Sequence, residues 1–139
     1  MSPAAAAVVT DMLRAVVEEG TGRKARDIGF VVAGKTGTSN EFKDALFVGY
    51  SPKALTGVWV GRDDAQPLGW GETGGRAALP IWMRFMASIH DGRHVGGFAW
   101  PASVIAVPID PNSGQRAPET DPNARIVLFD VDHLPATLQ

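Results

Sequence analysis

Apolar residues at helical spacing predict one helix on each side of a strand-rich centre. They recur over 8–17, and Ser2 and Pro3 precede them in the order typical of an N-cap and a first helical position. A second apolar helical face runs over 77–90, where Pro80 lies close enough to the start to be tolerated. Both helices are expected to pack their apolar faces on a core.

Short runs of apolar, β-branched and aromatic residues between these helices predict three strands, at about 29–38, 45–50 and 55–61. The Lys53-Ala54 turn is short enough to make the second and third strands an antiparallel hairpin. We therefore predict an α/β fold of the α+β type, in which an antiparallel sheet of about three central strands is flanked by helices.

Beyond Gly96 the pattern is interrupted by repeated prolines. Short strands are predicted at 104–107 and 125–131. Residues 121–139 are predicted to form a poorly constrained tail.

The composition indicates one domain with a core, because the 139 residues are 45% hydrophobic and 20% charged. A net charge of -2 gives no electrostatic footprint for nucleic acid, so no nucleic-acid partner is expected. The basic cluster Arg23-Lys24-Ala25-Arg26 is predicted to be a solvated turn. The absence of cysteine excludes disulfides and thiolate metal sites, and it is compatible with an extracytoplasmic location.

The first predicted strand ends in small polar residues around one lysine. Gly34 and Gly37 lack side chains, which suggests that another group approaches the backbone closely. Lys35 supplies a positive charge, and Thr36 and Thr38 supply hydroxyls. In an ideal strand Lys35 and Gly37 share one face and the two threonines the other, and alternation alone does not decide which pair faces a ligand. Together these residues predict an anion-recognising strand edge.

The same stretch, from Gly29 to Thr36, also satisfies the P-loop pattern. A phosphate cradle needs a strand before its first glycine and a helix that begins at the Lys-Thr pair. Here the segment 21–27 is polar and turn-like, and residues 37–40 are poor helix formers. Nucleotide binding therefore ranks last among the three functions considered for this stretch.

A longer series of motifs carries a family resemblance. The chain contains, in order, Lys35-Thr36-Gly37-Thr38, DALFVGYSP at 44–52, TGVWVGRDD at 56–64 and TGGRAALPIW at 73–82. This series resembles the C-terminal part of the transpeptidase domain of a class A penicillin-binding protein, over residues 3–120. The resemblance implies a partial serine β-lactamase/transpeptidase-like fold. In that family a serine of a Ser-x-x-Lys motif attacks the D-Ala-D-Ala end of a peptidoglycan stem peptide, and a Ser-x-Asn motif assists.

The resemblance also implies roles for the strand residues, because the family's substrate peptide lies along the open edge of this strand. Lys35 and Thr38 are the implied catalytic residues, Lys35 as a positive charge near the scissile bond and Thr38 through an N–H that donates to the oxyanion. Thr36, Gly37, Thr38 and Ser39 are the implied substrate-binding residues, and the two threonine hydroxyls are expected to hold the terminal carboxylate. The implied ligands are the stem peptide and β-lactams.

The nucleophile motifs are absent from the sequence. None of Ser2, Ser39, Ser51, Ser88, Ser103 and Ser113 has a lysine three residues on or an asparagine two residues on. The resemblance therefore implies that residues 1–120 are the C-terminal portion of the transpeptidase domain of a larger D,D-transpeptidase, followed by the tail at 121–139. Alone, the chain is expected to be inactive. The missing strands would leave a sheet edge or face exposed, which predicts self-association or poor solubility.

The compartment of the parent protein also follows from the resemblance. The N-terminal stretch lacks the basic region of a signal peptide, and no apolar run reaches membrane-spanning length. A membrane anchor is therefore expected only upstream of this chain, and the parent is expected at the periplasmic face of the bacterial inner membrane.

No metal or cofactor is predicted. Asp63 and Asp64 point apart on an extended chain and suit a turn. His90 and His94 have the spacing of a helical metal pair, but Gly92 interrupts the helix pattern and no third ligand is evident.

Two further interpretations concern a loop near the implied active site and an alternative function for the chain. In the family the glycine-rich loop 65–76 approaches the active-site rim, so Thr73 and Gly74 are contact candidates. The alternative function is a non-enzymatic peptide- or partner-binding module, which would use the same strand edge without a nucleophile.

Overall fold

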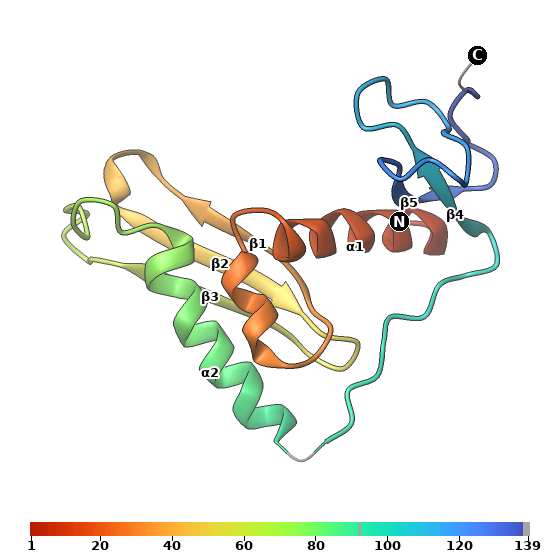
Figure 1. Cartoon of the computed structure of the whole chain (residues 1–139). Helices are drawn as coiled ribbons and strands as arrows, with labels where there is room; N and C mark the ends of the chain where they lie inside the picture. The colour runs from red at the N-terminus through yellow and green to blue at the C-terminus, as the bar shows by residue number, and fades with distance from the viewer. Residues whose placement is uncertain (92, 138–139) are drawn as a thin grey trace. The chain divides into compact units, whose positions relative to one another are not determined.

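The computed structural model describes residues 1–91 and 93–137. Its elements are α1 (Pro3–Glu18), the 3-10 helix η1 (Arg23–Ile28), β1 (Ala33–Thr38), the 3-10 helix η2 (Asn40–Phe42), β2 (Asp44–Tyr50), β3 (Leu55–Gly61), the π-helical turn η3 (Gly74–Ala78), α2 (Leu79–His90), β4 (Val104–Ile109) and β5 (Arg125–Asp130), as Figure 1 shows. The chain forms two compact units: Leu13–Phe98, and Met1–Met12 together with Ala99–Gln139. Each unit has its own sheet.

The larger unit is built on a three-stranded antiparallel sheet with the order β1-β2-β3. This confirms the predicted fold class and the predicted β2–β3 hairpin. The register of β1 on β2 runs from Ala33 opposite Tyr50 to Thr38 opposite Ala45. Among the described residues β1 has no strand neighbour other than β2, so its second edge is open.

The helix α2 packs on the sheet through a tight aromatic contact (Figure 1). Phe47 and Trp82 are both fully buried, and their rings meet edge to face with centroids 4.9 Å apart. The Trp82 indole N–H donates to the carbonyl oxygens of Thr56 at 3.0 Å and Gly49 at 3.3 Å. A Cβ at Gly49 would come within 2.8 Å of the indole ring, so only glycine lets the helix approach this closely.

Strand β1 is shorter than predicted, because it begins at Ala33 rather than near residue 29. Its partner β2 ends at Tyr50, opposite Ala33, so no paired backbone remains for residues 29–32. Phe30 instead places its ring edge-on to that of His90, with centroids 4.9 Å apart. The preceding segment also differs from the predicted basic loop, because it forms η1. Gly29 follows this helix in the left-handed conformation, with a φ of 87°.

The two ends of the chain form the smaller unit. β4 and β5 pair with each other antiparallel along their whole length. Ala4 and Ala7 of α1 form a small apolar cluster with Val104, and Trp100 and Leu128 pack against it. Ser2 begins this helix as predicted, because its hydroxyl oxygen accepts a hydrogen bond from the Ala5 N–H at 3.1 Å.

The predicted tail at 121–139 is therefore corrected where β5 lies. The strand is held by β4, and a further backbone bond joins the Arg116 N–H to the Ala136 carbonyl at 2.8 Å. The strand predicted at 125–131 is therefore present as β5, and its pairing with β4 orders this part of the predicted tail. Residues 138 and 139 are outside the described part of the chain, and the division at residue 120 stays a prediction. No helix among the described residues is long and apolar enough to cross a membrane.

Candidate functional site

The open edge of β1 carries a positive charge, and no acidic group among the described residues pairs with it. Lys35 is exposed, and its ammonium donates to the carbonyl oxygen of Thr36 at 2.9 Å. It makes no ion pair with any residue that the structure describes. A free cation beside an unpaired strand edge suits an anionic ligand that adds to the sheet.

Thr36 and Thr38 share the other face of β1, where two distant segments meet them. The hydroxyl oxygens of Thr36 and Thr21 lie 2.7 Å apart and form a hydrogen bond. The hydroxyl oxygen of Thr38 accepts a hydrogen bond from the Gly74 N–H at 3.1 Å. Because that contact uses an acceptor lone pair, the Thr38 O–H hydrogen is left to donate to a ligand.

Gly74 allows this contact because it has no side chain. A Cβ at this position would overlap the carbonyl oxygens of Leu46 and Gly37. The backbone of η3 therefore packs directly on the backbones of β1 and β2. Gly34 is approached in a similar way, but by the core: a Cβ there would lie 2.8 Å from the Phe47 ring.

Ser39 closes the connection between β1 and β2. Its hydroxyl oxygen accepts from the Asp44 N–H at 2.7 Å, and its own N–H donates to the Asp44 carbonyl at 3.0 Å. Glu41 and Phe42 follow with φ values of 61° and 55°, an uncommon conformation for residues other than glycine. Ser39 thus fixes the end of β1, and its hydroxyl hydrogen is still available as a donor.

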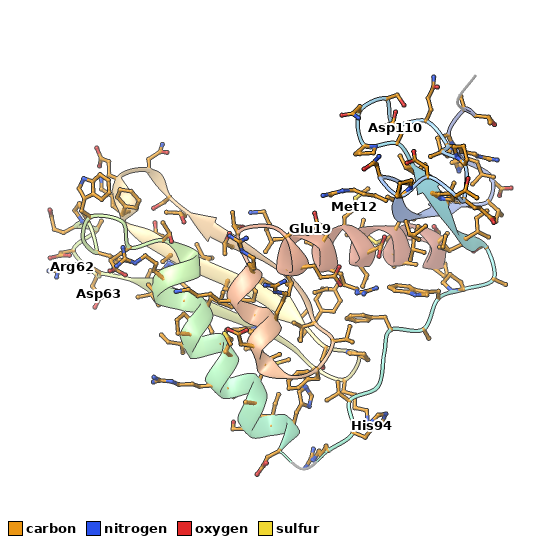
Figure 2. The ribbon with its side chains drawn as sticks, in the orientation of Figure 1. Met12, Glu19, Arg62, Asp63, His94 and Asp110 are labelled. Carbon is orange, nitrogen blue, oxygen red and sulfur yellow. The ribbon has the colours of Figure 1, made fainter. Side chains whose placement is uncertain are left out.

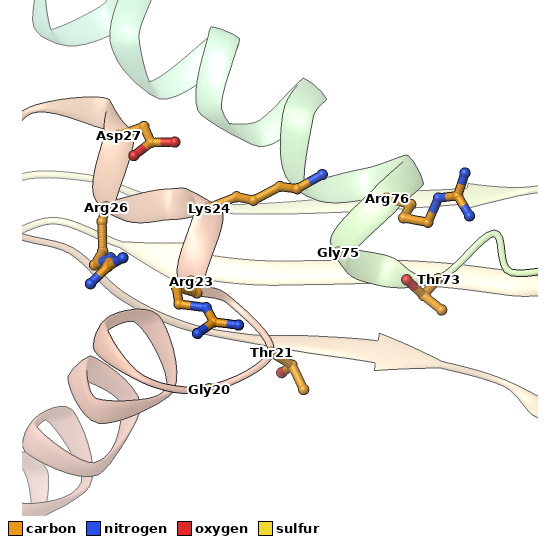
Figure 3. Close-up of a pocket in the computed structure, with 9 residues that line it drawn as sticks. All are labelled: Gly20, Thr21, Arg23, Lys24, Arg26, Asp27, Thr73, Gly75 and Arg76. Atoms are coloured by element: carbon orange, nitrogen blue, oxygen red, sulfur yellow. The ribbon is translucent and has the colours of Figure 1, made fainter.

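The structure adds a basic pocket to the residues that the sequence singled out. The pocket has a volume of about 650 Å³ and lies between the segment after α1 and the start of η3 (Figure 3). It is lined by Gly20, Thr21, Arg23, Lys24, Arg26, Asp27, Thr73, Gly75 and Arg76. The basic cluster predicted as a solvated turn is therefore exposed as expected, but it forms one wall of this pocket. Nothing in the local sequence joins it to Thr73 and Arg76, which come about fifty positions later.

The P-loop interpretation is wrong for this chain. Lys35 and Thr36 lie in the middle of β1, whereas a phosphate cradle would place them at the start of a helix.

Asp63 and Asp64 are exposed and follow the end of β3, where Figure 2 labels Asp63. Asp64 accepts two hydrogen bonds from the Arg62 guanidinium, at 2.9 and 2.7 Å. This pairing, helped by the Gln66 N–H, lowers the pKa of Asp64 below its usual range.

His90 and His94, whose spacing in the sequence is that of a helical metal pair, have different surroundings. His90 is buried, and its Nε2 lies 2.9 Å from the Ser51 hydroxyl oxygen, which also accepts from two backbone N–H groups of its turn. His94 is exposed (Figure 2). The intervening Gly92 lies outside the described residues.

Comparison with known proteins gives consistent matches. A model of the penicillin binding protein transpeptidase domain matches residues 1–87. Penicillin-binding protein 1A of Aquifex aeolicus is 48% identical over 113 residues, which are 81% of this chain and 16% of that protein. Penicillin-binding protein 1A of Pseudomonas aeruginosa is 38% identical over 132 residues, 94% of this chain and again 16% of that protein.

A solved structure shows the same arrangement in three dimensions. The crystal structure of penicillin-binding protein 1A from Haemophilus influenzae matches with a TM-score of 0.89 and 25% identity, covering 100% of this chain and 22% of that one. The chain thus spans about a fifth or less of the length of these relatives.

Proposed function

Because the chain belongs to the penicillin binding protein transpeptidase domain family, we propose that it is the substrate-binding C-terminal segment of a serine-type peptidoglycan D,D-transpeptidase. The observation that supports this best is the open edge of β1, where Lys35 has no acidic partner among the described residues and the Thr38 hydroxyl is held by Gly74. These groups would receive the anionic end of a stem peptide or of a β-lactam.

In this proposal the stem peptide adds to β1 as an extra strand. The carboxylate of its terminal D-alanine accepts hydrogen bonds from the hydroxyls of Thr36 and Thr38. Lys35 supplies the positive charge near the scissile amide. Ser39 and Gly37 contribute through their place at the end of the strand, where the ligand backbone passes.

The reaction itself needs a serine from the rest of the parent domain. That serine attacks the carbonyl of the penultimate D-alanine, the amide bond breaks, and free D-alanine leaves as its amine takes a proton. An amine of a neighbouring stem peptide then attacks the acyl-enzyme ester, forms the cross-link and returns the proton to the serine. Thr38 would donate its N–H to the oxyanion of both tetrahedral intermediates.

The proposal places the parent protein at the periplasmic face of the inner membrane. It also implies that the chain alone forms no acyl adduct. Self-association of the isolated chain is part of the same proposal, because Val48, Leu55 and Trp59 are exposed on the sheet at 46%, 70% and 55%.

Fluorescent penicillin tests the proposal on two preparations, the complete product of the gene that encodes this chain and the 139-residue chain alone. We expect a covalent, stoichiometric adduct on a serine of the complete product and none on the chain. An adduct on the chain alone, or none on a folded complete product, would contradict the proposal.

A further inference from the structure

The basic pocket beside Thr21 has no part in the proposed chemistry. Four cationic side chains line it, and Asp27 is its one lining carboxylate, which leaves a formal charge of +3 from four positive groups and one negative group. None of these charged groups makes an ion pair with a described residue. A concave surface with such an excess of one charge attracts ligands of the opposite charge.

The cations come from two segments. Figure 3 shows the side chains of Arg23 and Lys24 extending from η1 toward the side on which Thr73 and Arg76 lie. Both segments belong to the larger unit, Leu13–Phe98, so the pocket lies within one compact body. Its volume of about 650 Å³ is within the range of small-molecule sites and exceeds what a single carboxylate fills.

Two residues that line the pocket also adjoin the proposed substrate edge. Thr21, which lines it, is the hydrogen-bond partner of Thr36. Gly75, another lining residue, is so near that a Cβ on it would lie 3.8 Å from the Thr36 methyl carbon and 3.3 Å from the Thr21 carbonyl oxygen. The pocket therefore lies next to Thr36, on the face of β1 that carries the two threonine hydroxyls.

We propose that the basic pocket is a second anion subsite, which takes a carboxylate of the stem peptide other than that of its terminal D-alanine. This inference rests on the proposed function, and a stem peptide meets its requirement because it carries further carboxylates on the residues before the two D-alanines. The subsite favours an acidic donor strand over a neutral one. A small β-lactam with a single carboxylate would use the threonines and leave the pocket empty.

The test uses the complete gene product and two soluble stem pentapeptides, one with its D-glutamate and diamino-acid carboxylates free and one with both amidated. Dissociation constants are measured for the unaltered protein, for Arg23→Gln, for Lys24→Gln and for the double variant. Arg84→Gln is the matched control, because Arg84 is exposed on α2 and does not line the pocket. The rate of acylation by benzylpenicillin is measured on every variant, and it shows that the variants are folded.

We expect the double variant to weaken binding of the acidic peptide by about tenfold or more, since each lost charge-assisted contact costs severalfold in affinity. The amidated peptide and the acylation rate should be unchanged, and Arg84→Gln should alter neither affinity. Equal losses for both peptides, or no loss for the acidic one, would overturn the subsite while acylation by penicillin upholds the proposed function. A folded protein that is not acylated and binds neither peptide would overturn both.

Discussion

Replacing Gly74 by alanine should push the start of α2 away from the strand edge. The added Cβ would overlap the carbonyl oxygens of Leu46 and Gly37, two backbone atoms that cannot turn aside as a side chain can. Relief requires η3 to move, and the hydrogen bond from the Gly74 N–H to the Thr38 hydroxyl oxygen is then lost. Overpacking costs about 1–3 kcal/mol and a lost hydrogen bond about 1 kcal/mol, so we expect a destabilisation of about 2–4 kcal/mol.

Gly75→Ala is the matched control, one position along the same turn. Neither glycine has a positive φ, and a Cβ at Gly75 would meet its nearest atom, the Thr21 carbonyl oxygen, at 3.3 Å. Both variants gain the same reduction in unfolded-state entropy, so the difference between them isolates the backbone contact.

Urea unfolding of the chain, at a protein concentration low enough to keep it monomeric and followed by tryptophan fluorescence, measures both variants. A difference of about 2–4 kcal/mol corresponds to a midpoint lower by about 1–2 M urea for Gly74→Ala. Equal midpoints for the two variants would show that η3 does not pack on β1 as described, and the account of how Thr38 is positioned would fail with it.

Two further predictions concern the core and the hairpin end. Trp82→Phe removes the indole N–H that donates to the carbonyl oxygens of Thr56 and Gly49, and it leaves a cavity. We therefore expect the free energy of unfolding, measured in urea, to fall by about 2–3 kcal/mol. A decrease of less than about 1 kcal/mol would contradict the described contact. The Arg62 guanidinium lowers the pKa of Asp64, so folding favours the ionised carboxylate. This carboxylate stabilises the fold at any pH above its usual pKa, and the stabilisation is lost as the pH falls through the pKa of Asp64 in the folded protein. Carboxyl-carbon NMR should give Asp64 a pKa below the usual range, and Arg62→Gln should raise it; an unchanged value would refute the pairing.

The central sheet and the two helices could be predicted because local signals and tertiary packing agree there. In β2, Ala45, Phe47 and Gly49 alternate with outward-facing residues, and in α2 the apolar spacing places Trp82 on the buried face. The start of β1 could not be predicted from its own residues. Phe30 and the valines after it have strand-like composition, but strand length is set by where β2 ends.

The candidate substrate edge of β1 was predictable only in part. Lys35, Thr36 and Thr38 are adjacent in sequence, and a charged and hydroxylated strand end is visible without a structure. The partners of the threonines were not, because Thr21 and Gly74 reach them by tertiary packing over 15 and 36 positions. The basic pocket could not be predicted either, because it is also formed by tertiary packing. A run of arginine and lysine looks the same in sequence whether it lines a cavity or lies on a flat surface.

The most direct test of the central claim is the rate at which benzylpenicillin acylates the complete gene product, followed by intact mass. Lys35→Ala is compared with Lys53→Ala. Lys53 lies in the turn between β2 and β3, where its ammonium donates to the His94 carbonyl oxygen. If β1 is the substrate-binding strand of a transpeptidase, the unaltered protein and Lys53→Ala form the adduct at equal rates, and Lys35→Ala is slower by about 100-fold or more. A folded protein that forms no adduct, or an adduct rate that Lys35→Ala leaves unchanged, would contradict the claim and favour a non-enzymatic peptide-binding role for the same edge.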